Sequence, residues 1–114
     1  MTDGLKDLAR ISAMLRDREL GAVERIVSQL NAIQSDIARL QDAQSARRTD
    51  ASIDTARLTG MDMSWLAETE RRILRLRQQE AALRAAHETA LGRARKAFGR
   101  ADVTARIAGI KPPV

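Results

Sequence analysis

The chain of 114 residues has no cysteine, no tyrosine, one tryptophan, one phenylalanine and one histidine. Without cysteine it has neither a disulfide framework nor a thiolate metal ligand. Strand-forming aromatic and β-branched residues are sparse, whereas alanine, arginine, leucine, glutamate and glutamine favour helix. No stretch approaches the roughly 20 consecutive apolar residues of a membrane span. The composition therefore predicts an all-α protein that does not insert into a membrane.

Helix breakers are also scarce, since both prolines lie at positions 112 and 113. The apolar pattern predicts a first helix over about residues 4–47, a turn over about 48–61 and a second helix over about 62–108. Gly109 and the prolines end the second helix, and residues 109–114 are predicted to be a disordered tail. Residues 1–18 mix charged and apolar side chains and do not resemble a signal peptide, so we expect a cytoplasmic protein.

The apolar residues of the two predicted helices form mirrored stripes. The first stripe comprises Leu15, Ala22, Ile26, Leu30, Ile33, Ile37 and Leu40, and the second Ile73, Leu76, Glu80, Leu83, His87, Leu91 and Phe98. Both step by three and four residues, as in a coiled coil, and both contain two consecutive steps of four, which is a stutter. Positions whose numbers add to about 113 face each other if the helices are antiparallel, and the stutters then coincide. The stripes predict a single domain, a long antiparallel coiled-coil hairpin with Leu15 and Phe98 in its core.

Two glycines also face each other under this sum, Gly21 and Gly92. They either allow a close approach of the helices or are tolerated weak points of each helix. His87 and Glu88 match part of the zinc motif His-Glu-x-x-His, but position 91 is leucine and no second histidine exists. The sequence also has no catalytic triad and no glycine-rich phosphate loop. We therefore predict no enzyme, no metal and no cofactor.

The formal net charge of +5 calls for an acidic partner, and the cations are concentrated late in the chain. Arg93, Arg95, Lys96 and Arg100 are the candidate partner-binding residues of this basic end, although a merely solvated helix face would have the same composition. At the predicted turn, Met61, Met63, Trp65 and Leu66 form a second candidate partner-binding cluster. The alternative for Trp65 is a structural plug over Leu66 and the end of the first stripe.

The whole-chain layout resembles the FliJ/YscO family of type III export systems, the stalk proteins of flagellar and injectisome export. The resemblance lies in the leucine-periodic start Leu5-Lys-Asp-Leu-Ala-Arg-Ile, the Trp65-Leu66 entry to the second helix, and the alanine-rich basic segment of residues 91–102. It implies an antiparallel coiled coil that binds the export ATPase with its basic end and the export gate protein towards its turn. It also implies contact with export chaperones and a location at an inner-membrane export complex.

The leading functional prediction is thus a non-enzymatic coupling or adaptor rod of a protein export apparatus. One alternative is a basic hairpin that binds nucleic acid through its phosphates. Another is a self-assembling scaffold, in which a homodimer forms a four-helix bundle and covers the thin alanine-rich core.

Overall fold

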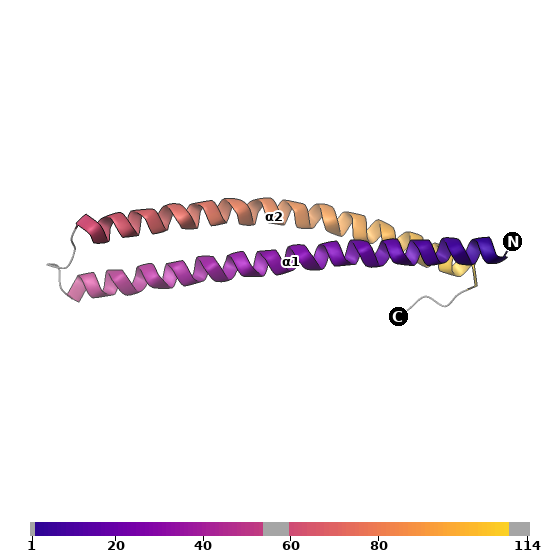
Figure 1. Ribbon diagram of the computed structural model, residues 1–114, viewed down its shortest axis with the longest axis horizontal. Coiled ribbons are helices and arrows are strands. Elements are labelled where there is room, and N and C mark those ends of the chain that lie inside the picture. The colour runs from indigo at the N-terminus through magenta and orange to yellow at the C-terminus, as the bar shows by residue number, and fades with distance from the viewer. Residues whose placement is uncertain (1, 54–59, 110–114) are drawn as a thin grey trace. The chain divides into compact units, whose positions relative to one another are not determined.

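The computed structural model describes residues 2–53 and 60–109, which form two helices and no strand. Helix α1 spans Thr2–Ile53 and helix α2 spans Gly60–Ile107. The chain divides into two compact units, each a pair of antiparallel helix segments (Figure 1). Unit 1 contains residues 1–28 and 85–114, and unit 2 contains residues 29–84. The predicted all-α hairpin of two helices is confirmed. Neither helix, over its described residues, has an apolar stretch long enough to cross a membrane.

The helices are longer than predicted at the turn. Helix α1 continues beyond Arg47 to Ile53, and α2 already begins at Gly60, so the predicted turn over 48–61 was too long. Polar, short side chains in this region do not end α1, and the Thr49 hydroxyl donates a hydrogen bond of 2.9 Å to the carbonyl of Ser45 in the preceding turn, so it does not compete for a backbone N–H of the helix. Residues 54–59 lie outside the described part of the chain.

Helix α2 ends where the sequence predicts. Gly109 has a φ of +73°, in the left-handed region that glycine enters without a Cβ penalty. Its N–H donates to the carbonyl of Arg106 at 3.1 Å, one of the two hydrogen bonds of a Schellman cap. The predicted disordered tail lies, from residue 110 onward, outside the described residues.

In unit 2, the predicted apolar stripes form the seam, by which we mean the buried and half-buried positions between the two helices. Ile37 and Ile73 are the most enclosed aliphatic side chains, at 6% and 3% exposure. The seam also takes in two polar residues that the stripes left out, Gln44 and Thr69. The amide of Gln44 donates a hydrogen bond of 3.0 Å to Glu70 on the other helix. This bond satisfies a buried polar group, which would otherwise be costly.

In unit 1, the seam differs from the prediction. Leu15 and Phe98, expected in the core, are 44% and 45% exposed. The buried positions are instead occupied by small side chains, namely Ala9, Ser12, Ala90, Ala94, Ala97, Ala101 and Ala105. Alanine permits a short distance between helix axes, and at that distance larger side chains fit only beside the seam. The expectation that the largest apolar residues mark the core was wrong here.

At the predicted stutters the burial pattern is wider than a single stripe, because Ala22 and Leu91 are half-buried together with their neighbours Gly21, Val23 and Gly92. One set of buried or half-buried positions steps regularly by three and four along α1 from Ala9 to Gln44, and along α2 from Leu66 to Thr104. In α1 the unbroken repeat passes through Val23 rather than Ala22. In α2 the unbroken repeat continues from His87 to Ala90, whereas the predicted stripe continued from His87 to the larger Leu91. An uninterrupted seven-residue repeat is the pattern of a regular coiled coil.

The predicted antiparallel register is correct. Three cross-helix contacts join Gln44 to Glu70, Arg16 to Phe98 and Arg47 to Trp65. The residue numbers of each pair add to between 112 and 114, in agreement with the expected value near 113. The Arg16–Phe98 pair lies in unit 1 and the other two pairs lie in unit 2, so the register holds within each unit.

Candidate protein-binding surface

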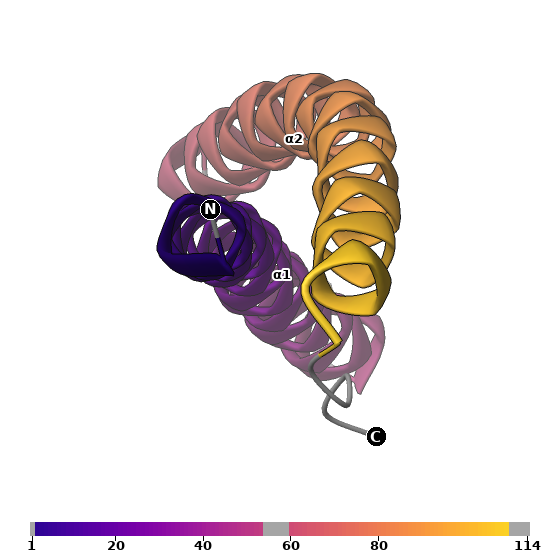
Figure 2. The same ribbon diagram turned by 90° about the vertical axis from the view of Figure 1, so that its right-hand side faces the viewer.

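Three of the four predicted cations of the basic end surround one hollow in unit 1. Its volume is about 190 Å³, and its lining residues are Ser12, Leu15, Glu19, Arg93, Lys96, Ala97 and Arg100. The α2 members recur at intervals of three and four residues, which brings them to one side of that helix. The start of α1 and the end of α2 lie at the same end of unit 1 (Figure 2). We call the hollow formed by these lining residues the terminal groove.

The cations of the terminal groove are not neutralised by any carboxylate within residues 2–53 and 60–109. Arg93, Lys96 and Arg100 are exposed and form no ion pair with any residue that the structure describes. Arg106, six residues beyond Arg100, differs because Asp102 binds its guanidinium at 3.1 Å. Glu19 is the one carboxylate in the lining. The groove therefore presents an excess of positive charge to a ligand.

Apolar side chains extend the terminal groove along both helices. On α1, Leu8 and Ile11 precede the lining residue Leu15 by seven and four positions, on the same side of the helix, and are 50% and 53% exposed. On α2, Val103 and Ile107 follow Arg100 by three and seven positions and are 53% and 61% exposed. Leu8, Ile11 and Leu15 thus form an apolar row on α1. The neighbouring row on α2 begins with the cations of the terminal groove and continues with the apolar residues Val103 and Ile107.

Arg95, the fourth predicted cation, is not part of this groove. It is absent from the lining and is two positions from Arg93, which places it towards a different side of α2. Phe98, three positions further, shares that side with Arg95. The guanidinium of Arg16 lies over the Phe98 ring, with Cζ 5.8 Å from the centroid, and the Arg16 side chain is only 18% exposed. The structure therefore divides the predicted basic cluster between two sides of unit 1.

The predicted cluster at the turn end is also divided. Leu66 occupies the seam of unit 2, whereas Met63 is 59% exposed. Trp65 is half-buried, and the Arg47 guanidinium from α1 covers its ring at 4.0 Å from the centroid. A cation at this distance interacts favourably with the π-face. The side chain of Met61 lies outside the described residues.

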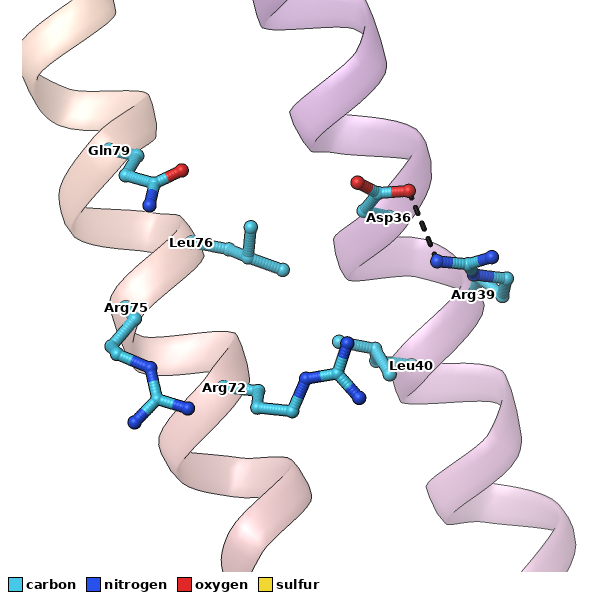
Figure 3. Close-up of a pocket in the computed structure, with 7 residues that line it drawn as sticks. All are labelled: Asp36, Arg39, Leu40, Arg72, Arg75, Leu76 and Gln79. Atoms are coloured by element: carbon cyan, nitrogen blue, oxygen red, sulfur yellow. Dashed lines mark hydrogen bonds and ion pairs between the residues drawn. The ribbon is translucent and has the colours of Figure 1, made fainter.

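Unit 2 has a second hollow that sequence reasoning missed. Its volume is about 140 Å³, and Figure 3 shows its lining residues Asp36, Arg39, Leu40, Arg72, Arg75, Leu76 and Gln79. Arg72 extends from α2 across to Leu40 on α1 (Figure 3). Two of its three arginines are paired, Arg39 with Asp36 at 3.2 Å and Arg75 with Glu68 at 3.5 Å. Both hollows are smaller than the roughly 300 Å³ at which small-molecule pockets begin.

Exposed large apolar side chains are concentrated in unit 1. Of the twelve among the described residues, only Met63 and Leu74 belong to unit 2. Clusters of exposed apolar groups on a soluble protein mark interaction surfaces, whereas isolated ones are ordinary. Unit 1 is therefore the stronger candidate for binding a partner.

The two polar residues of the predicted stripes, Glu80 and His87, are half-buried. Glu80 is ion-paired with Arg84 at 3.5 Å, and His87 lies in the seam of unit 1. Within residues 2–53 and 60–109, no three histidine or carboxylate side chains come together to hold a metal ion.

The apolar part of the terminal groove was not identified from sequence, although Leu8, Ile11 and Leu15 recur at helical spacing. That spacing reads equally well as a core stripe. Only the burial of Ala9 and Ser12 next to these residues shows that they lie beside the seam. No family model, curated protein or solved structure matches the chain.

Proposed function

We propose that this protein is a non-enzymatic adaptor that couples components of a type III export apparatus by binding them along its helix pairs. The terminal groove of unit 1 would bind the export ATPase, and the turn end around Met63 and Trp65 would bind the export gate protein. Export chaperones are further partners implied by the family resemblance.

The observation that carries this proposal is the terminal groove itself. It combines three cations that have no ion-pair partner among the described residues, Arg93, Lys96 and Arg100, with the exposed apolar side chains of α1. Protein interfaces typically have an apolar centre and a polar or charged rim, and complementary charge speeds the encounter of partners. The small volume of the hollow favours a protein ligand over an enclosed small molecule.

Capture of the purified export ATPase from the same organism on immobilised protein tests the proposal. We expect binding at low salt that weakens as salt screens the cations. A variant with Arg93 and Lys96 replaced by glutamate should lose most of this binding, whereas Arg84→Glu in unit 2 should retain it. Absence of ATPase binding by the unmodified protein at low salt would refute the export role.

Nucleic acid is the second candidate, because the same three cations lie on one helix side and could contact phosphates. A duplex DNA titration separates the two functions: phosphate binding predicts a steep loss of affinity with salt and no dependence on Leu8 or Ile11. Self-association into a homodimer is the remaining alternative, and sedimentation over a concentration series tests it.

A further inference from the structure

The geometry points to one class of ligand for the terminal groove: an amphipathic α-helix of another protein, with an apolar stripe flanked by aspartate or glutamate. We propose that this helix lies along unit 1 as a third helix, in the groove between α1 and α2, where it covers the apolar row of α1 and the groove's cations on α2. The inference rests on the proposed function, since it specifies the chemistry of the partner at the same surface.

The apolar requirement follows from the α1 side of the groove. Leu8, Ile11 and Leu15 are each at least 44% exposed, and Ala97 forms part of the groove between the helices. The row covers about two helical turns, or roughly 10 Å. A partner helix with leucine-like residues spaced three and four apart can cover such a row from end to end. An extended peptide, whose side chains alternate between two faces, matches this spacing poorly.

The acidic requirement follows from the α2 side. Arg93, Lys96 and Arg100 line the groove without an ion-pair partner among the described residues, and Glu19 opposes them alone. Carboxylates on the edge of the partner helix would lie opposite these cations. A basic or neutral helix with the same apolar stripe would leave the cations uncompensated, which disfavours it.

A second copy of this chain fits the groove less well. Over its full sequence, unit 1 has eleven lysine and arginine residues against seven aspartate and glutamate residues. Pairing two terminal grooves would bring Lys96 and Arg100 of one copy towards the same cations of the other. Charge complementarity therefore favours an acidic partner over a homodimer.

A pair of designed peptides tests the proposal on the full-length protein. Both are about three heptads long and carry the same leucine stripe, but one has glutamate and the other lysine at the flanking positions. In fluorescence anisotropy at low salt, the glutamate peptide should bind at least about tenfold more tightly than the lysine peptide. Equal binding of the two, or no binding of the glutamate peptide, would overturn the inference.

Matched variants locate the binding site. Replacing Lys96 and Arg100 by glutamate should weaken binding of the glutamate peptide by about tenfold, whereas Arg95→Glu and Arg84→Glu, both outside the groove, should each change it by less than about threefold. Ile11→Ser should weaken binding, and the equally exposed Leu74→Ser in unit 2 should not. Circular dichroism of each variant checks that the helices are retained, and equal effects of groove and control variants would overturn the assignment.

The outcome for the export ATPase is separable from this test. If the peptide binds selectively but the unmodified protein does not capture the ATPase, the export role is refuted and the groove assignment stands. If the ATPase is captured equally by the unmodified protein and by the variant with Lys96 and Arg100 reversed, the groove inference is refuted and the adaptor role stands.

Discussion

Replacing Gly92 by alanine should stabilise the protein, although the sequence allowed Gly92 and Gly21 to be a site of close helix approach. A Cβ built at Gly92 meets no side chain or neighbouring helix within 4 Å. A Cβ at Gly21 meets only the Arg25 guanidinium, at an ordinary contact distance of 3.5 Å. Glycine within a helix costs about 1 kcal/mol relative to alanine, so each substitution should raise the free energy of unfolding by about that amount.

Urea denaturation followed by circular dichroism measures the effect, at several protein concentrations to exclude a change in self-association. The double variant should gain about 2 kcal/mol, because sites without a steric conflict are additive within roughly 0.5 kcal/mol. Gly109→Ala is the matched control: the same methyl group is added at a φ of +73°, where it should cost about 1 kcal/mol instead.

If the helices approached closely at these glycines, the alanine substitutions would instead lower the free energy of unfolding. Added methyl groups would then overpack the interface and destabilise it by about 1–3 kcal/mol. A loss of stability in Gly92→Ala, or a strongly unfavourable coupling in the double variant, would refute the absence of a steric conflict at these two glycines.

Three further predictions concern the seam, an ion pair and the tryptophan. Ala97→Leu should lower the free energy of unfolding by about 1–3 kcal/mol because it overpacks the seam, whereas Phe98→Leu should lower it by less than about 1 kcal/mol. If urea denaturation gives the reverse order, Phe98 is a core residue after all. The hydrogen bond from Arg71, together with that from Arg75, lowers the pKa of Glu68. The interaction of ionised Glu68 with these arginines therefore stabilises the fold at pH values above the ordinary carboxylate pKa, and this stabilisation is lost as the pH falls through the lowered pKa. Arg71→Ala should raise the pKa of Glu68 in a carboxyl NMR titration, and an unchanged pKa would contradict this. Arg47→Ala should uncover the Trp65 ring and increase its quenching by acrylamide, and unchanged quenching would show that Arg47 does not cover it.

The helical content and the register follow from local properties of the sequence. Without internal proline and with few strand formers, two long helices are the available regular structure, and Gly109 supplies a stop that needs no distant contact. The antiparallel register, in which the numbers of facing residues add to about 113, could be predicted because an apolar repeat on one helix must match that on the other to be buried. In unit 2 the repeat is marked by large aliphatic residues such as Ile37 and Ile73, so pattern and burial coincide.

The composition of the terminal groove could not be read in this way. Along residues 90–105 the alanine row and the row of larger residues both have helical spacing, and periodicity does not say which one faces the other helix. The choice depends on the distance between the two helices, since Ala94 and Ala97 can be buried only if the helices are close, and Leu15 and Phe98 are then displaced to the flanks. Local residue preferences therefore specify the helices, the C-terminal end of α2 and the pairing register, whereas the packing distance between the helices determines which apolar residues remain free for a partner.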